Sequence, residues 1–224
     1  MNKNQQLIKR MSFVAIFAAL SALLYTIVPK FSLPIFPVFL EVNFSMIPIV
    51  ICAFMLGPID GAICVLVRFL IKLPATSTMC VGETADFLIG LPVALGAGLI
   101  YYKTNFKYKE LYAFLIAFGL WVLMGIITNA FINIPFYSAV IPGGMDAIIG
   151  ASSSAFKAIS GGAISEVTVD NFMFYYLLCA VLPFNALLSS IVLIITWPIH
   201  KRLKVLYDMV SFGKNHKSEE DSEK

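Results

Sequence analysis

Charged residues are scarce in this sequence. Only 13% of its 224 residues are Asp, Glu, Lys or Arg, whereas 59% are hydrophobic. An ordinary soluble domain has about 25% charged residues, so this composition excludes a conventional soluble fold. The formal net charge of +3 is too small to indicate a nucleic-acid partner. The sequence therefore predicts an integral membrane protein.

Residues suited to metal, redox or catalytic chemistry are also few. The chain has four cysteines without a CxxC pair, and both histidines lie in its basic C-terminal segment. Walker A, HExxH, GxSxG and Asp-rich metal-binding motifs are absent from the sequence. We therefore expect no metal site, no cofactor and no enzymatic activity. Any ATP hydrolysis that drives a transport step must come from a partner.

Long hydrophobic runs are abundant, and a helix needs about 20 apolar residues to cross the hydrocarbon of a membrane. Proline, glycine and charged residues divide residues 1–204 into six candidate spans, which predicts a single all-α domain. The expected spans are residues 11–28, 41–56, 62–73, 81–102, 111–134 and 171–198. Residues 205–224 are charged and have little to bury, so we expect a disordered cytoplasmic tail.

Two of the connections carry strong proline and glycine signals. Residues 29–40 contain three prolines, which predicts a structured loop at the membrane surface in place of a continuous helix. Gly57–Gly61 predicts a tight turn. Pro135 should end the fifth span and leave a long connection over residues 135–171, which is typical of a lid or a binding element.

A short helix is expected inside that long connection, over residues 147–159. Asp146 should cap its start, and Gly161 and Gly162 should end it. Asp170 should cap the last span. The basic residues then fix the orientation: with both termini inside, 12 of the 16 Lys and Arg residues lie on the cytoplasmic side. The sequence therefore predicts a multi-pass protein of the cell membrane with both termini in the cytoplasm.

Glu83 and Asp86 stand at the head of an otherwise apolar span. An ionised carboxylate is costly to bury, so an acidic residue in such a segment indicates a site that faces protein, a ligand or water. Their i, i+3 spacing places both on one side of a helix. The alternative is that both simply cap the helix in water. In the next helix back, Arg68 should face protein, and Lys72 should snorkel to the surface.

Other polar and aromatic residues fall in the same outer half of the predicted bundle. Amides both donate and accept hydrogen bonds, and aromatic faces stack on flat rings, so this grouping predicts an outward-facing pocket for a planar heterocycle. The alternative is that the asparagines only tie helices together. With the two acids, the predicted ligand-binding residues are Glu41, Asn43, Phe44, Glu83, Asp86, Asn129, Asn133, Tyr137 and Asn185.

Four alanines lie at helical spacing in the first span. Small side chains allow another helix to approach closely where van der Waals packing must drive association. This ridge either docks a partner protein or packs inside the bundle, and its members are Ala15, Ala18, Ala19 and Ala22.

Five segments, in order and spacing, resemble the riboflavin-specific S component of energy-coupling factor (ECF) vitamin transporters. They are LEVNFSMIP (Leu40 to Pro48), the GPIDG turn, VGETADFLIG (Val81 to Gly90), TNAFINIPFY (Thr128 to Tyr137) and VLPFN (Val181 to Asn185). The resemblance extends over about residues 11–204.

This resemblance implies a six-helix subunit of the bacterial plasma membrane that captures its vitamin, riboflavin or a related flavin, from outside. It also implies docking of the alanine ridge onto a membrane T component that works with two ATPase subunits. Asn129 and Asn185 would hydrogen-bond the flavin ring, Glu41 and Asn43 would lie at the pocket, and the loop over residues 29–40 would help to close it.

Several positions depart from the family pattern. Leu188 and Glu41 replace lysines, Asn43 and Met46 replace aspartates, and Asp86 replaces an amide. These exchanges leave open an S component for another vitamin, such as pantothenate or a thiamin precursor. Two further alternatives are a lipid-modifying membrane enzyme, with Glu83 and Asp86 as metal ligands, and a self-sufficient ion-coupled carrier.

Overall fold

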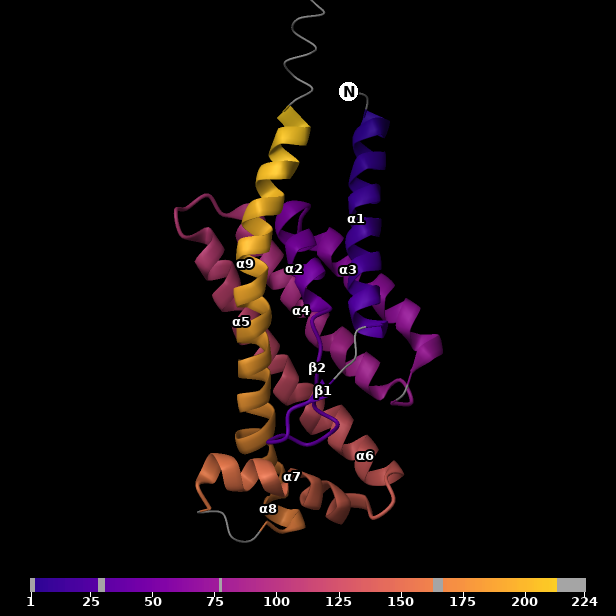
Figure 1. Cartoon of the computed structure of the whole chain (residues 1–224), viewed down its shortest axis with the longest axis vertical. Coiled ribbons are helices and arrows are strands. Elements are labelled where there is room, and N and C mark those ends of the chain that lie inside the picture. Colours follow the sequence, from indigo (N-terminus) through magenta and orange to yellow (C-terminus); the bar gives the residue numbers. More distant parts are fainter. Residues whose placement is uncertain (1–2, 28–30, 77, 163–166, 213–224) are drawn as a thin grey trace, which may run out of the picture.

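A bundle of long helices forms the body of the protein (Figure 1), in a computed structural model that describes residues 3–27, 31–76, 78–162 and 167–212. The start of α1 (Lys3–Thr26) and the far end of α9 (Leu182–Phe212) lie at the same end of the bundle. The helices α7 (Gly144–Ser160) and α8 (Val169–Tyr176) lie across the opposite end. We call these two ends the terminal end and the α7 end.

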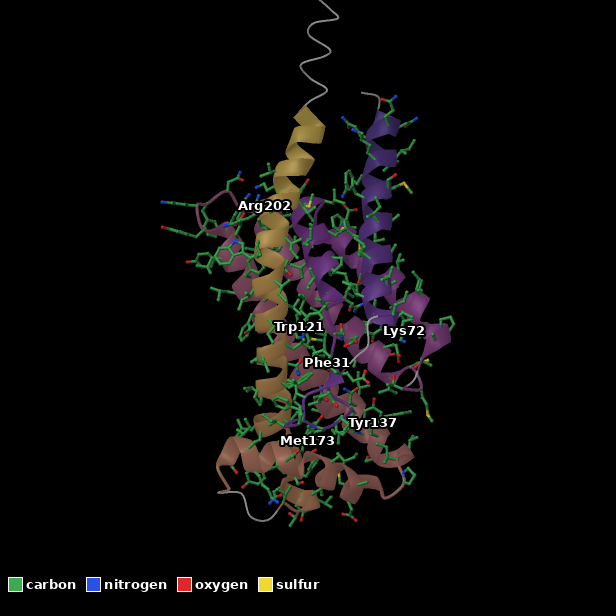
Figure 2. All side chains as sticks on the ribbon, in the orientation of Figure 1. Phe31, Lys72, Trp121, Tyr137, Met173 and Arg202 are labelled. Atoms are coloured by element: carbon green, nitrogen blue, oxygen red, sulfur yellow. The ribbon has the colours of Figure 1, made fainter. Side chains whose placement is uncertain are left out.

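Four helical stretches in the described part of the chain are long and apolar enough to cross a membrane. They are Asn4–Thr26, Val81–Lys103, Lys109–Val140 and Val169–Val205. The second and third predicted spans correspond to shorter helices, α2 (Met46–Met55) and α3 (Pro58–Lys72). Met173 on α8 lies near the α7 end, and Arg202 on α9 lies toward the terminal end (Figure 2).

The short helix α2 lies at the centre of the bundle. It contacts α1, α3, α4 (Val81–Lys103) and α9, and eight of its ten residues are buried. Gly57, at φ +120°, reverses the chain, and Pro58 begins α3. The predicted turn over Gly57–Gly61 is therefore confined to Gly57. Gly61 lies so close to α2 that a Cβ added there would be 2.6 Å from the Ala53 Cβ.

The proline-containing loop is stabilised by a small hairpin. Strand β1 (Phe31–Ser32) pairs antiparallel with β2 (Glu41–Val42), with Phe31 opposite Val42. The prediction that this loop is not helical is confirmed from residue 31 onward, whereas Pro29 and Lys30 lie outside the described residues. The predicted second span is wrong at its start, because Glu41 and Val42 are extended and α2 begins only at Met46.

Pro135 does not end the fifth span. The helix α5 (Lys109–Thr128) passes through a π-helical segment, η2 (Asn129–Asn133), directly into α6 (Ile134–Val140). The Ile134 N–H donates to the Asn129 carbonyl, five residues back. This wider turn places Pro135 in the first turn of α6, where its missing N–H costs little. The prediction that Pro135 ends the span is wrong because a proline can also follow a π-helical turn and lie in the first turn of the next helix.

The same arrangement recurs before Pro183. The π-helical segment η3 (Leu177–Val181) joins α8 to α9, and the Leu182 N–H donates to the Leu177 carbonyl. The two π-helical segments contact each other. Both bulged helices therefore widen at one level of the bundle.

Most of the predicted loop over residues 135–171 is helical. It contains the end of α6, all of α7 and the start of α8. Asp146 lies in the first turn of α7 but does not cap it, because the helix already begins at Gly144, after Gly143 at φ +89°. Gly161, at φ +60°, ends α7 as predicted. Thr168, with Asn171 in a capping box, replaces Asp170 as the cap of α8.

The C-terminal boundary predicted at residue 204 falls inside a helix. The chain remains helical to Phe212, so the predicted disorder is wrong for residues 205–212. Residues 213–224, which make up the rest of the predicted tail, lie outside the described residues.

Candidate functional site: a pocket with an amide end and an acid end

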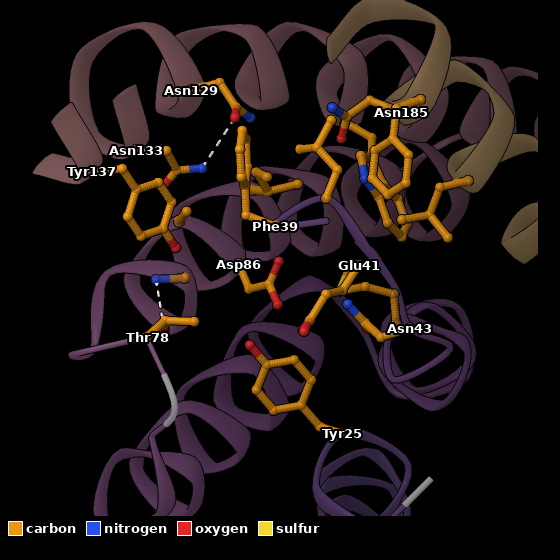
Figure 3. Close-up of a pocket in the computed structure, with 18 of the residues that line it drawn as sticks. Tyr25, Phe39, Glu41, Asn43, Thr78, Asp86, Asn129, Asn133, Tyr137 and Asn185 are labelled. Atoms are coloured by element: carbon orange, nitrogen blue, oxygen red, sulfur yellow. Dashed lines mark hydrogen bonds between the residues drawn. The ribbon is translucent and has the colours of Figure 1, made fainter. Parts of the chain in front are cut away.

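A pocket gathers side chains from α1, the β1–β2 loop, α3, α4, α5, η2, α6 and α9 (Figure 3). Seven of the nine predicted ligand-binding residues line it. They are Glu41, Asn43, Asp86, Asn129, Asn133, Tyr137 and Asn185. The asparagines therefore line one pocket and do not point to separate places.

Asn129 and Asn133 reach the pocket from η2. Their i, i+4 spacing places them on one side of the helix, and the Asn133 Nδ2 donates to the Asn129 Oδ1 at 3.2 Å. The hydroxyl of Tyr176 also donates to the Asn129 Oδ1, at 2.9 Å. The Asn129 Nδ2 donates to the Gly125 carbonyl at 2.8 Å. Asn129 is thus held in one orientation by bonds at both ends of its amide.

The Asn133 amide is only partly satisfied. Its Oδ1 is buried and accepts no hydrogen bond from the described part of the chain. A buried polar atom of this kind is costly unless something pairs with it. Within the pocket, this oxygen offers an acceptor to the N–H or O–H group of a ligand.

Asn185 approaches from α9, two residues after Pro183. Its Nδ2 donates to the Val181 carbonyl at 2.9 Å. Gly125 on α5 makes room for it, because a Cβ at that position would lie 2.6–2.8 Å from the atoms of the Asn185 amide. We call Asn129, Asn133 and Asn185 the amide end of the pocket.

Aromatic side chains form much of the wall beside the amide end. Phe39 comes from the β1–β2 loop and Tyr137 from α6, and their ring centroids are 5.7 Å apart. Trp121 and Phe184 come from α5 and α9. Phe184 is fixed by an edge-to-face contact with Phe36 at 5.4 Å. These rings offer apolar faces to a flat ligand.

The opposite end of the pocket is acidic. Figure 3 shows the Tyr25 hydroxyl and the carboxylates of Glu41 and Asp86 turned toward one another. We call these three residues the acid end. They come from α1, β2 and α4, elements that lie far apart in the sequence.

Arg68 lies behind the acid end and is 2% exposed, which confirms the prediction that it faces protein. Its Nη1 donates to the Ser45 Oγ at 2.7 Å, and its Nη2 donates to the Asp86 backbone carbonyl at 3.2 Å. The prediction that Lys72 snorkels to the surface is wrong. Lys72 is 8% exposed, and its Nζ lies 5.8 Å from the centre of the Tyr25 ring, where a cation–π contact stabilises it.

Phe44 and Glu83 are the two predicted site residues outside the pocket lining. Phe44 packs against the hydrophobic core. The Glu83 carboxylate is buried and accepts hydrogen bonds from Thr76 Oγ1 at 2.8 Å and Thr78 Oγ1 at 2.5 Å. It therefore stabilises the connection before α4. The alternative that Glu83 caps the helix in water is wrong, and Glu83 and Asp86 do not face a common site.

Sequence reasoning missed several lining residues. Tyr25, Trp121 and Phe184 lie in apolar runs, where nothing in the pattern separates a pocket residue from a core residue. Met46 and Leu188 also line the pocket. Their departure from the family pattern was the signal in the sequence that could have identified them. The departures from the family pattern thus fall where they can affect the choice of ligand.

The four alanines of α1 do not form one exposed surface. Ala18 and Ala22 are 2% and 5% exposed and pack inside the bundle, whereas Ala15 and Ala19 are exposed. The two AxxxA pairs therefore lie on different faces of the helix. Packing inside the bundle, one of the two readings of the ridge, applies to the pair Ala18 and Ala22.

The long apolar helices and the pocket among them are typical of a membrane protein with an internal site. More specifically, the chain belongs to the family described as "ECF transporter, substrate-specific component", whose sequence model matches residues 9–200. Members of this family are components of transporters, not enzymes.

Characterised relatives cover most of the chain. It is 29% identical to the riboflavin transporter RibU of Staphylococcus aureus (strain TCH60), over 74% of this chain and 89% of that protein. It is 31% identical to the riboflavin transporter RibU of Lactococcus lactis subsp. cremoris (strain NZ9000), over 80% and 85%. A solved structure described as the S component of a bacterial ECF transporter superposes with a TM-score of 0.65. That match has 25% identity and covers 89% of this chain and 97% of the other.

Proposed function

We propose that this protein is the substrate-binding subunit of an ECF importer and captures riboflavin for uptake across the bacterial plasma membrane. The observation that carries the proposal is the amide end of the pocket, where Asn133 offers a buried, unpaired acceptor beside two oriented amides. The relatives named riboflavin transporters support the choice of vitamin.

The chemistry of the pocket suits a flavin. One edge of the flavin ring carries two carbonyls on either side of an N–H group, and amide side chains can match both donors and acceptors. The Asn133 Oδ1 is suited to accept from the ring N–H. The apolar faces of the ring can pack against Phe39, Trp121 and Phe184. The polyol chain of riboflavin would then extend toward the acid end.

The experiment is a binding titration with purified protein in detergent. Riboflavin fluorescence should be quenched at micromolar protein or below. Asn133→Leu should weaken riboflavin binding by about tenfold or more, because it removes the free acceptor and leaves the N–H of the ring unpaired. The matched control is Asn105→Leu, an exposed asparagine between α4 and α5, which should bind like the wild type. The absence of quenching by wild-type protein would refute the proposal.

A ligand panel tests the choice of vitamin. Riboflavin should raise the melting temperature of the protein, because it binds only the folded state. Pantothenate and thiamin precursors should not. A shift with either of them and none with riboflavin would reassign the subunit to that vitamin.

We also propose six membrane crossings with cytoplasmic termini. In this arrangement, α2 and α3 complete the set of spans, and the terminal end faces the ATPase subunits. The start of α1 and the end of α9 lie together, in keeping with this topology. Reporter fusions at both termini should give cytoplasmic signals, and an external signal from either one would contradict it.

The exposed face of α1 is the proposed docking surface for the T component. Ala15 and Ala19 allow a close approach there, whereas the buried Ala18 and Ala22 would have to be uncovered first. Ala19→Trp should abolish copurification with the T component and leave riboflavin binding intact. The control is Ile194→Trp, at a position on α9 that is 67% exposed. Loss of riboflavin binding in Ala19→Trp would show that this face packs internally.

A further inference from the structure

A cluster of cations lies toward the terminal end, outside the pocket lining. Residues 103–110 and 201–204 together contain six Lys or Arg residues and one acid, Glu110. The first group spans the connection between α4 and α5, and the second belongs to α9, which passes beside this connection (Figure 1). Two segments that are distant in the sequence therefore concentrate positive charge in one part of the molecule.

Aromatic rings hold three of these cations in place. The Lys204 Nζ donates to the Tyr101 hydroxyl at 3.1 Å, and the Lys109 Nζ lies 4.9 Å from the centre of the same ring. The Lys201 Nζ lies 4.6 Å from the centre of the exposed Trp197 ring. A cation–π contact orients a lysine without neutralising its charge. We call Lys109, Trp197, Lys201 and Lys204 the lysine–aromatic surface.

Two of these lysines, Lys109 and Lys201, form no ion pair with a carboxylate of the described residues. The ion pair found in that part of the chain joins Arg10 on α1 to Asp60 on α3. Glu110, the neighbouring acid in the sequence, pairs with neither lysine. The positive charge of the lysine–aromatic surface is therefore available to an anion.

An apolar face continues from these cations along the bundle. Ile194, Trp197 and Lys201 recur at i, i+3 and i+7 on α9, which places them on one side of the helix. Trp197 contacts Phe114 of α5, with ring centroids 6.2 Å apart, and Leu111 lies one turn before Phe114. Ile194, Trp197 and Leu111 are all exposed. Cations beside such a face match a molecule with an anionic head and hydrocarbon tails.

We propose that the lysine–aromatic surface binds the headgroup of an anionic phospholipid, whose acyl chains lie along the apolar face of α5 and α9. Lysine ammonium groups donate to phosphate oxygens, and tryptophan is enriched at the level of lipid headgroups. A soluble anion would match the cations but not the exposed Ile194 and Leu111. This inference does not depend on which ligand occupies the pocket.

The test places the purified protein in phosphatidylcholine nanodiscs and measures tryptophan fluorescence. The chain has two tryptophans, of which Trp197 lies at the proposed site and Trp121 is buried. Phosphatidylglycerol with brominated acyl chains should quench Trp197, and Trp197→Phe should lose this quenching. In competition, phosphatidylglycerol should bind at least about tenfold more tightly than brominated phosphatidylcholine. Equal quenching by the two lipids would overturn the proposal.

A double variant locates the site. Lys109→Gln combined with Lys201→Gln should reduce the preference for phosphatidylglycerol by about fivefold or more. The control is Lys9→Gln combined with Lys157→Gln, which removes the same charge from α1 and α7 and should keep the wild-type preference. A melting temperature close to that of the wild type shows that each variant is folded. An unchanged preference in the first variant, or an equal loss in both, would overturn the proposal.

A soluble headgroup separates a lipid from a free phosphate. Glycerol 1-phosphate carries the phosphate without acyl chains, so an excess of it should leave the quenching by brominated phosphatidylglycerol unchanged. Displacement of the lipid by glycerol 1-phosphate would assign the cations to a soluble anion and overturn the proposal.

Discussion

The pocket and the core around α2 are built in opposite ways. The two helical stretches that supply the asparagines are each widened by a π-helical segment before a proline, at η2 and at η3. In contrast, α2 is a regular helix, and Ile49 and Ala53 in it are 0% exposed. The core depends on close packing, whereas the pocket depends on departures from helical regularity.

The comparison separates the part of the fold that provides stability from the part that is shaped for a ligand. Around α2, eight of ten residues are buried, and van der Waals packing holds the helices together. At the amide end, polar groups are oriented by hydrogen bonds, and one acceptor remains unpaired. We therefore expect core substitutions to act mainly on stability, and substitutions near the pocket to act mainly on affinity.

Ile49→Ala should have the largest effect on stability. The substitution leaves a cavity in the centre of the bundle and should cost about 2–5 kcal/mol. Thermal unfolding in detergent should show a lower melting temperature, while the folded fraction should bind riboflavin with affinity close to that of the wild type. Ile59→Ala is the control, because Ile59 is 65% exposed on α3 and should change little. Equal melting temperatures for the two variants would refute the central role of α2.

Gly125→Ala should weaken riboflavin binding by about 10- to 100-fold and affect stability less. The new methyl group would lie 2.6–2.8 Å from the Asn185 amide, which must move away. Displacing the oriented Asn185 amide should cost about 1.4–3 kcal/mol of riboflavin binding free energy. Isothermal titration of the purified protein measures it.

Gly119→Ala provides the matched control for Gly125→Ala. Both glycines lie on α5, but a Cβ at position 119 meets no atom within 4 Å. Affinity in Gly119→Ala should therefore equal that of the wild type. If both variants bound riboflavin normally, the close approach of α5 to Asn185 would have no importance for binding.

Many of the long helices and most of the proposed pocket residues could be predicted from the sequence. Hydrophobic runs and charged connections gave the long helices, and the asparagines and acids pointed to a pocket with seven of the nine proposed residues. The resemblance to S components depended on short motifs that include Asn129 and Asn185. These signals are local, so a single sequence contains them.

The features that could not be predicted depend on neighbours in space. Pro135 looked like a helix end because the π-helical segment before it has no clear sequence signature. Their spacing places Glu83 and Asp86 on one helix face. In the structure, however, Glu83 accepts hydrogen bonds from Thr76 and Thr78, whereas Asp86 lines the pocket. Lys72 and Ala18 are buried only because other elements cover them.

Tyr176→Phe should have the smallest effect and bears directly on the orientation of the amide end. The buried hydroxyl donates to the Asn129 Oδ1 at 2.9 Å, and this oxygen keeps a second donor, Asn133, when the hydroxyl is removed. The loss should therefore be about 1 kcal/mol, or roughly fivefold in riboflavin affinity. Tyr175→Phe on the same helix is the control, since the hydroxyl that donates to the Asn129 Oδ1 belongs to Tyr176 and not to Tyr175. Equal affinities in the two variants would show that the bonds of Asn129 to Gly125 and Asn133 are enough to orient it.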